Sequence, residues 1–273
     1  MNIIDFHTHI FPDEIAQRAL SQLSEHSGDY RPHTDGTLSG LLSSMEEAGI
    51  VLSIVANIAT KPSQVVPILE FCKKIKGRRI YPLISIHPHT PHGQIQEVIK
   101  EAKASGIYGI KLHPMYQDFE IDSSGMFPIY ELIIKEGFFV VFHTGYDIAF
   151  PGNHNADLER LAHLAGHYPE LRIVATHLGG WRQWDRVSKI TEYENVYTEI
   201  SMTMTEMTEE EFLSVLSVFN PERVFFGTDS PWTDQKEMVQ RLMALPLTSE
   251  LKEKLLFRNA LNFISLWSQG QSH

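Results

Sequence analysis

The feature that most constrains the fold is a regular alternation of short apolar runs with segments of helical spacing. Each run is apolar along its whole length rather than at every second residue. Continuous apolarity is typical of strands covered on both faces, as in parallel sheets. The predicted strands are a first one through residues 5–9, followed by 51–56, 80–86, 108–112, 138–142, 172–176, 196–200 and 223–227.

The segments between these runs place apolar residues three or four positions apart, which predicts helices. The predicted helices cover residues 13–25, 38–48, 63–76, 94–105, 126–136, 156–167, 183–192, 208–219, 234–244 and 249–267. Eight strand and helix units in 273 residues favour an α/β fold of the closed (β/α)8 TIM-barrel type over an open doubly wound sheet. The sequence also lacks the Gly-rich loops of nucleotide-binding folds.

No Pro, Ser or Gly-rich linker and no shift in composition divides the chain. A single barrel domain over residues 1–273 is therefore expected. The 34 acidic residues outnumber the 23 basic ones, for a formal net charge of -11. This balance argues against a surface that follows nucleic-acid phosphates and leaves a small molecule as the expected partner.

Cysteine usage and the N-terminus indicate the compartment. Cys72 is the one cysteine, so the chain forms no internal disulfide, which fits a reducing cytosol. The first residues show no secretory signal pattern, and no apolar run approaches the length of a membrane span. A cytoplasmic protein without membrane contact is expected.

Side chains of metal-ligating type follow several predicted strands. His7 and His9 share one face of the first strand, because alternate side chains of a strand point the same way. His143, His177 and Asp229 stand at the ends of three later strands. In a barrel these ends converge on the rim that carries active sites. Nitrogen and oxygen donors without cysteine predict one divalent metal, Zn²⁺ first, with Mn²⁺, Fe²⁺ or Co²⁺ as substitutes.

The sequence is identified by its motifs as a member of the amidohydrolase superfamily. It resembles the amidohydrolase-2 branch, which includes proteins similar to aminocarboxymuconate-semialdehyde decarboxylase. The matching pieces span nearly the whole chain in the order of that family. They are Asp5 to His9, Gly109 to Pro114, Val141 to Gly145, Thr176 to Gly180, Phe226 to Pro231 and the Asn259-Ala260 pair.

The resemblance implies specific roles for these residues. It assigns His7, His9 and His143 as ligands of one metal, with Asp229 completing the set. It assigns His177 to polarising the substrate or assisting proton transfer. Members of this branch often form dimers, so a homodimer is a further expectation.

The lysine motif leaves the number of metals open. Other members of the superfamily carry a carbamylated lysine that bridges two metals, and Lys111 stands at that position. In the amidohydrolase-2 branch this motif usually accompanies a mononuclear site, which favours an unmodified Lys111. A binuclear site with carbamylated Lys111 is the alternative.

Metal-dependent hydrolysis is the function that the sequence favours. A bound metal can lower the pKa of its water to about 7, Asp229 can take the proton, and His177 can hold the developing oxyanion. The expected substrate is a small carboxylated or cyclic compound such as a lactone, amide or ester. The alternative is non-oxidative decarboxylation of an aromatic or muconate-type acid, in which Asp229 or His177 delivers a proton to the carbanion.

Two further classes rank lower. TatD-like nucleases share the first His-x-His motif, and His87-Pro88-His89 resembles the end of their third strand, but Lys111 replaces their glutamate. A metal-stabilised barrel without catalysis, serving as a binding module, is the last alternative.

Substrate contacts are expected from the loops that follow the strands. The candidates are Lys111, His113, Tyr146 and Arg182. The Arg182 guanidinium suits a substrate carboxylate, and an ion pair on the surface is its alternative role. Glu199 is expected to pair with Lys111, or otherwise to support a ligand histidine.

Overall fold

The computed structural model describes residues 2–268, so the ends of the predicted domain range, residue 1 and residues 269–273, lie outside the described residues. The eight strands among the described residues alternate with helices along the chain. The strands are β1 Ile4–Thr8, β2 Leu52–Ala56, β3 Ile80–Leu83, β4 Gly109–Leu112, β5 Phe139–Phe142, β6 Arg172–Ala175, β7 Val196–Glu199 and β8 Val224–Phe225.

The strands are parallel and close into a barrel. Hydrogen bonds order β1, β2 and β3 in one sheet and β4 to β8 in another. Two single bridges join the sheets. Thr8 of β1 pairs with Ser230 in the segment after β8, and Ile84, the residue after β3, pairs with Ile110 of β4. The predicted (β/α)8 barrel is thereby confirmed.

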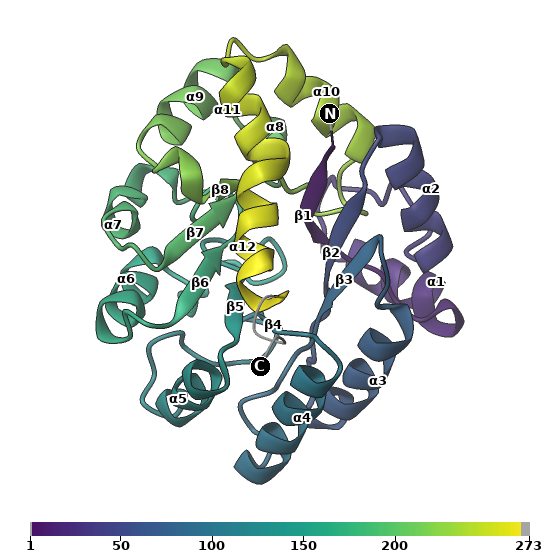
Figure 1. Ribbon diagram of the computed structural model, residues 1–273, viewed down its shortest axis with the longest axis vertical. Helices are drawn as coiled ribbons and strands as arrows, with labels where there is room; N and C mark the ends of the chain where they lie inside the picture. Colours follow the sequence, from purple (N-terminus) through teal and green to yellow (C-terminus); the bar gives the residue numbers. More distant parts are fainter. Residues whose placement is uncertain (1, 269–273) are drawn as a thin grey trace.

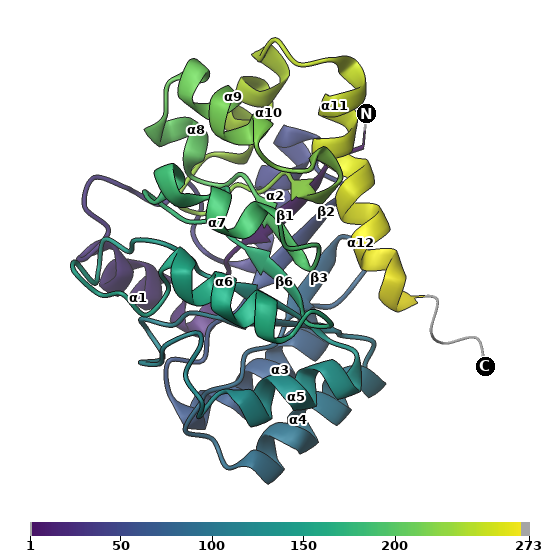
Figure 2. The same cartoon turned by 90° about the vertical axis from the view of Figure 1, so that its left-hand side faces the viewer.

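Helices surround the strands (Figures 1 and 2). The α-helices are α1 Asp13–Ser24, α2 Leu38–Ala48, α3 Val65–Ile75, α4 His92–Ala104, α5 Phe127–Glu136, α6 Leu158–His167, α7 Ser188–Thr191, α8 Thr203–Glu206, α9 Glu209–Ser217, α10 Gln235–Ala244, α11 Ser249–Glu253 and α12 Asn259–Ser268. Shorter helical turns are η1 Pro62–Gln64, η2 Trp184–Arg186, η3 Pro221–Arg223 and η4 Lys254–Arg258, the last a π-helix.

Several predicted elements are shorter or divided in the structure, and two of them lie beside the rim. The helix predicted over 183–192 divides into the turn η2 and the four-residue α7. The strand predicted over 223–227 is reduced to β8. There the backbone leaves β7, because Phe226 donates to the carbonyl of Leu255 and accepts from Phe6. The chain beyond β8 therefore runs beside β1 and brings Asp229 to the His-x-His strand.

Aromatic side chains fill the inside of the barrel. Phe6 stacks on Phe225 with ring centroids 4.4 Å apart, and Phe139 lies 6.5 Å from Phe6. The helix α12 lies across the barrel between the two sheets in Figure 1 and inserts Phe263 among these rings. Burying one such side chain stabilises the fold by about 1.5–3 kcal/mol. This packed interior leaves the opposite, carboxyl end of the barrel for polar residues.

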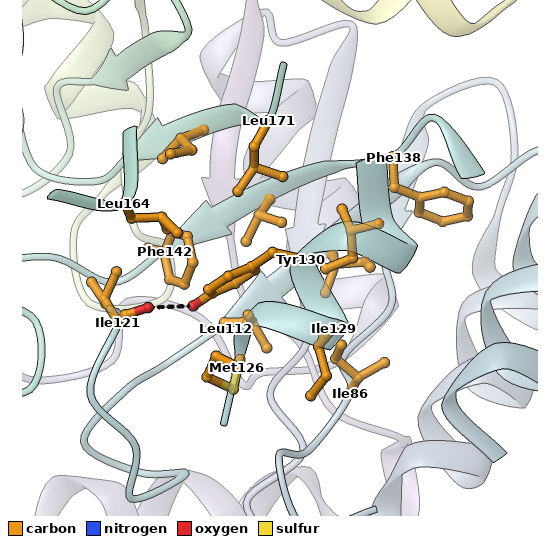
Figure 3. Packing of buried hydrophobic residues seen from close by; sticks show 14 of the residues in the cluster. Ile86, Leu112, Ile121, Met126, Ile129, Tyr130, Phe138, Phe142, Leu164 and Leu171 are labelled. Atoms are coloured by element: carbon orange, nitrogen blue, oxygen red, sulfur yellow. Dashed lines mark hydrogen bonds between the residues drawn. The ribbon is translucent and has the colours of Figure 1, made fainter. Parts of the chain in front are cut away.

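A second apolar cluster lies between the barrel and helices α3 to α6. Tyr130 of α5 is fully buried in it, and its hydroxyl donates a hydrogen bond to the carbonyl of Ile121 at 2.7 Å (Figure 3). Because the polar end of this ring has a partner, its burial carries no unsatisfied group. Cys72 is buried in the same cluster.

None of the helices in residues 2–268 has both the length and the apolar character that a membrane span requires.

Candidate metal centre

The side chains selected from the sequence all come from the carboxyl ends of the barrel strands or from the loops that follow them. They are His7 and His9 at β1, Lys111 and His113 at β4, His143 and Tyr146 at β5, His177 and Arg182 at β6, and Asp229 at β8. The loops that carry them include several residues with left-handed backbone, among them His177 at φ 60° and Asp229 at φ 62°. Such strained conformations persist where the surroundings over-determine them, and they concentrate at functional sites.

Three of the predicted metal ligands form one cluster, which we call the His7 cluster and which consists of His7, His9 and Asp229. The Nε2 atoms of the two histidines lie 3.1 Å apart. Asp229 Oδ1 lies 2.9 Å from Nε2 of His9 and 3.4 Å from Nε2 of His7. The three donor atoms therefore face a common point.

The outer nitrogens of the same two rings are already bound. Nδ1 of His7 lies 2.9 Å from Oε1 of Glu199, and Nδ1 of His9 lies 2.6 Å from the carbonyl of Ala56. Both partners accept hydrogen bonds, so the rings are assigned with the proton on Nδ1 and the lone pair on Nε2. Burial also holds the pKa of His7 well below its ordinary value and keeps that ring neutral.

The His7 cluster fits a divalent metal. Asp229 Oδ1 is buried and has no hydrogen-bond donor among residues 2–268, although two nitrogens stand close to it. Three lone-pair atoms facing one another repel unless a cation lies among them. A tetrahedral metal with bonds of about 2.0–2.1 Å separates its ligand atoms by about 3.3 Å, close to the distances in this cluster.

His143 and His177 form a neighbouring pair. Nδ1 of His143 faces Nε2 of His177 at 3.2 Å. Their outer nitrogens are again bound, that of His143 to the carbonyl of Tyr146 at 3.0 Å and that of His177 to Ser201 Oγ at 2.8 Å. The rings of His177 and His7 have centroids 5.4 Å apart. The structure thus places His143, the remaining one of the four expected ligands, in this pair rather than in the His7 cluster.

Lys111 reaches the His7 cluster from β4. Its buried Nζ lies 3.3 Å from Nε2 of His7. Burial lowers the pKa of Lys111 to about 8, although Asp229 and Glu199 oppose this change. A lysine with this pKa is partly neutral near pH 8, and its Nζ atom then offers a further lone pair beside the His7 cluster.

Glu199 pairs with His7 rather than with Lys111. Besides its bond to His7, Oε1 accepts from the hydroxyl of Ser201 at 2.8 Å and from the backbone N–H of His177 at 3.1 Å. One carboxylate therefore orients parts of both histidine pairs, which is the usual way in which proteins fix metal-binding imidazoles. Of the two roles weighed for Glu199 from the sequence, the contacts match support of a histidine.

Asp5 fixes the backbone on which Asp229 stands. Its buried carboxylate accepts hydrogen bonds from Thr228 Oγ1 at 2.6 Å and from Gln235 Nε2 at 2.7 Å. It also accepts from the backbone N–H of His7 at 3.2 Å. The start of the chain and the segment after β8 are thus held together behind the His7 cluster.

His113 belongs to a separate cluster, which we call the Asp147 cluster and which consists of His113, His143 and Asp147. Oδ2 of Asp147 lies 3.1 Å from Nε2 of His113, and Oδ1 accepts from the backbone N–H of Ala149 at 2.7 Å. The rings of His113 and His143 stack with centroids 4.2 Å apart. Sequence patterns did not single out Asp147, whose one signal is its place four residues after His143.

Arg182 lies farther out on the rim. Its Nε and Nη2 donate to the two carboxylate oxygens of Glu206 at 2.8 Å each. The hydroxyl of Tyr30 binds the same carboxylate. The guanidinium carbon lies 5.3 Å from the ring centroid of Tyr146 and 4.9 Å from that of Trp181. Neither Tyr30 nor Glu206 could be selected from the sequence, since no motif marks a pairing between the loop after α1 and the end of α8.

Comparison with known proteins places this geometry in context. The sequence profile of the family described as Amidohydrolase matches residues 4–266. No curated protein sequence matches this chain. The resemblance inferred from the sequence motifs is confirmed by the family match.

Solved structures share the fold at low sequence identity. An uncharacterized TIM-barrel protein from Bordetella bronchiseptica is 19% identical, with a TM-score of 0.81 over 98% of this chain and 100% of that one. A 5-carboxyvanillate decarboxylase from Sphingomonas paucimobilis is 16% identical, with a TM-score of 0.72 over 97% and 99% of the two chains. Another 5-carboxyvanillate decarboxylase, from Novosphingobium aromaticivorans, was solved with manganese and 4-hydroxy-3-methoxy-5-nitrobenzoic acid. It is 14% identical, with a TM-score of 0.73 over 96% of each chain.

Proposed function

This chain belongs to the amidohydrolase family, and from that premise we propose that it is a metal-dependent, non-oxidative decarboxylase of an aromatic acid. The observation that carries the proposal is the His7 cluster, in which buried donor atoms face one another while their outer partners hold them in place. Sequence alone ranked hydrolysis first. The decarboxylases among the similar structures now favour the alternative.

His7, His9 and Asp229 would hold the metal, with Lys111 close by and with His143 linked to the cluster through the ring of His177. A bound divalent cation supplies Lewis acidity that fixes a substrate carboxylate and stabilises negative charge. The donor set suits zinc. Manganese is supported as well, because the similar decarboxylase was solved with that ion.

The reaction breaks the bond between a ring carbon and its carboxylate carbon. CO₂ leaves, and the ring carbon takes up one proton. Asp229 is placed to carry that proton, which it takes from water or from a phenolic hydroxyl of the substrate and passes on from its carboxyl group. His177 is buried, with a pKa lowered to about 4 by that burial, so it stays neutral and accepts or donates hydrogen bonds without holding a charge.

Aromatic side chains beside the histidines suit a flat substrate. The ring of Trp181 lies 6.0 Å from that of His177. Tyr116 meets His113 edge to face at 4.6 Å, and Phe150 packs on Tyr116 at 4.8 Å. Rings in these offset and perpendicular arrangements stabilise a bound aromatic ring by dispersion and quadrupole interactions.

Hydrolysis is the second candidate, and one observation favours it. Burial raises the pKa of the Asp229 carboxyl, but its contacts with His7 and His9 outweigh this effect and hold the pKa well below its usual range. A carboxylate that stays ionised is a ready general base for an attacking water. Hydrolysis of a lactone or amide would use this same base.

The deciding experiment follows the carboxylate carbon of the substrate. The protein is loaded with manganese or zinc and incubated in D₂O with 5-carboxyvanillate and hydroxybenzoates that carry ¹³C in the carboxylate. We expect labelled CO₂ and one deuterium at the vacated ring position. Intact acids, combined with opening of lactone or amide substrates by the same preparation, would overturn the decarboxylase proposal in favour of the hydrolase.

A further inference from the structure

Two tryptophans in the chain after β6 differ in their hydrogen bonds. Trp184, the first residue of η2, donates its indole N–H to the carbonyl of His177 at 2.8 Å. Trp181 stands three residues earlier and is 5% exposed, and its indole Nε1 is buried with no hydrogen-bond acceptor in the described part of the chain. Buried polar groups in proteins nearly always have a partner, so the unpaired N–H of Trp181 requires an explanation.

Backbone contacts from two loops hold Trp181. Its N–H donates to the carbonyl of Thr144 at 2.9 Å, and its carbonyl accepts from the N–H of Tyr146 at 2.8 Å. Gly145 permits this close approach, because a Cβ there would lie 2.4 Å from the backbone of Trp181. The loops after β5 and β6 are therefore joined at Trp181, which restricts where its indole can lie.

The side chains around the indole pack against it and have partners of their own. Three rings have centroids 5.9 or 6.0 Å from that of Trp181, and they belong to Tyr30, Tyr146 and His177. The hydroxyl of Tyr30 binds Glu206, and both ring nitrogens of His177 face other polar atoms. These neighbours thus stabilise the indole by ring packing, without accepting its hydrogen bond.

His177 connects Trp181 with the candidate metal centre. The ring centroid of His177 lies 6.0 Å from that of Trp181 and 5.4 Å from that of His7. An aromatic acid that binds at the His7 cluster and contacts His177 therefore has the Trp181 indole among its neighbouring side chains. The unpaired donor thus adjoins the place where the proposed function puts the substrate.

We propose that the indole N–H of Trp181 donates a hydrogen bond to an oxygen substituent on the substrate ring, which makes Trp181 a specificity-determining residue. This inference rests on the proposed function, because it assumes that an aromatic acid binds at the His7 cluster. An ether or hydroxyl oxygen is a sufficient acceptor for a neutral N–H. A ligand with a methylene group in that place leaves the buried donor unpaired.

The hydrogen-bond balance favours such a ligand. The Trp181 donor has no partner within the described protein, so the new bond replaces no existing bond of the chain. Satisfying a buried donor in this way should improve Kd by about tenfold relative to a ligand without the oxygen. The effect is large enough to measure with two ligands that differ in a single atom.

The test compares methoxybenzoates with ethylbenzoates. The two groups have nearly the same size, and an ether oxygen in one stands where a methylene group stands in the other. Calorimetry on the manganese-loaded protein measures Kd for the pairs substituted at each ring position. The preference of the wild type for methoxy over ethyl should exceed that of Trp181→Phe by about tenfold in at least one pair, because the variant keeps an aromatic ring and loses the donor.

Trp184→Phe is the matched control. It removes an indole N–H that already has an acceptor within the protein, so the preference for methoxy should stay as in the wild type. Equal preferences in the wild type and in Trp181→Phe overturn the proposal. Failure of all these acids to bind overturns it as well.

A sulfur analogue of tryptophan, benzothienylalanine, covers the case in which Trp181→Phe does not fold. Sulfur replaces the indole N–H in this analogue, so the ring size is kept and the donor is lost. At position 181 it should abolish the preference for methoxy without lowering the Tm. At position 184 it breaks the bond to His177 and should lower the Tm by a few degrees. An equal loss at both positions would show that the Trp181 donor is already bound in the free protein, which overturns the proposal.

Release of CO₂ separates this inference from the proposed function. A preference for methoxy that depends on Trp181, without decarboxylation of any aromatic acid, refutes the decarboxylase and keeps the donor role. Decarboxylation with the same preference in the wild type and in Trp181→Phe refutes the donor role and keeps the decarboxylase.

Discussion

Two clusters on the rim contain the same residue types, two histidines and one aspartate, and yet differ in what they can bind. In the Asp147 cluster the nitrogens and oxygens are paired within the protein. Nε2 of His113 binds Asp147, Nε2 of His143 lies 3.0 Å from the carbonyl of Tyr146, and the second carboxylate oxygen of Asp147 accepts a backbone N–H. In the His7 cluster the inner atoms of His7, His9 and Asp229 face one another and Lys111.

The difference lies in the partners behind the rings. Glu199 and the carbonyl of Ala56 accept hydrogen bonds from Nδ1 of His7 and of His9. Both Nε2 lone pairs therefore point toward the middle of the His7 cluster. In the Asp147 cluster the carboxylate of Asp147 itself accepts the hydrogen bond from the His113 ring. Residue type therefore does not define a metal site; the hydrogen bonds that turn the donor atoms inward do.

The strongest expected contrast is between Asp229→Asn and Asp147→Asn. Asp229→Asn removes a proposed ligand and the group that carries the proton, so CO₂ release should fall by about a thousandfold or more. Asp147→Asn should cost no more than about tenfold, because it removes a neighbour of the site. Both variants are measured at saturating metal, with circular dichroism to verify folding. Equal losses would show that the two clusters share the catalytic role.

The hydrogen bond from His7 to Glu199 offers a sharper comparison. In Glu199→Gln the charged acceptor of the His7 ring is lost, and metal affinity should drop by about 10- to 100-fold. Competition with a chelator of known affinity measures this change. Asp147→Asn serves as the control and should keep the wild-type affinity. An unchanged affinity in Glu199→Gln would show that the partners behind the rings do not control metal binding.

Removal of the Asp147 carboxylate should affect stability rather than metal binding. Asp147→Ala leaves the buried ring of His113 and the backbone N–H of Ala149 without their acceptor, which should lower the free energy of unfolding by about 1–3 kcal/mol. Urea titration of the metal-free protein measures the loss. Full stability of Asp147→Ala would contradict this role. A parallel loss of metal affinity would show that the Asp147 cluster shares the metal-binding role assigned to the His7 cluster.

Metal addition should give the smallest effect. A metal present at a hundred times its Kd stabilises the native state by about 2.7 kcal/mol, which raises the Tm by several degrees for a chain of this size. The rise should persist in Asp147→Asn and nearly vanish in Asp229→Asn. Thermal unfolding with manganese, zinc or a chelator checks this, and an equal rise in both variants would place the metal elsewhere.

The sequence carries much of this fold because local pattern and topology agree. The run 138–142 is apolar throughout, and the structure has β5 at Phe139–Phe142 within the barrel. The boundaries were less predictable near the rim, where β8 ends early because Phe226 bonds to β1 and to η4. Such exchanges between elements depend on closure of the barrel and leave no trace in local periodicity.

For the site, sequence identified the donor residues but not their partners. His7 and Glu199 are 192 residues apart, and their side chains touch only because barrel closure brings the carboxyl ends of β1 and β7 to the same rim. The same holds for Arg182 and Glu206, which come from the loop after β6 and from the end of α8. The sequence pattern indicates which residue types stand at strand ends. The direction of each ring nitrogen is set by tertiary contacts that the pattern does not contain.

The most direct measurement is the metal content of purified wild type, His7→Ala and His113→Ala, determined by elemental analysis after growth with manganese and zinc. The account predicts about one metal per chain in the wild type and in His113→Ala, and less than about a tenth of that in His7→Ala. A wild type that neither contains nor takes up metal, or a His113→Ala variant that loses it as fully as His7→Ala, would contradict the assignment of the metal to the His7 cluster.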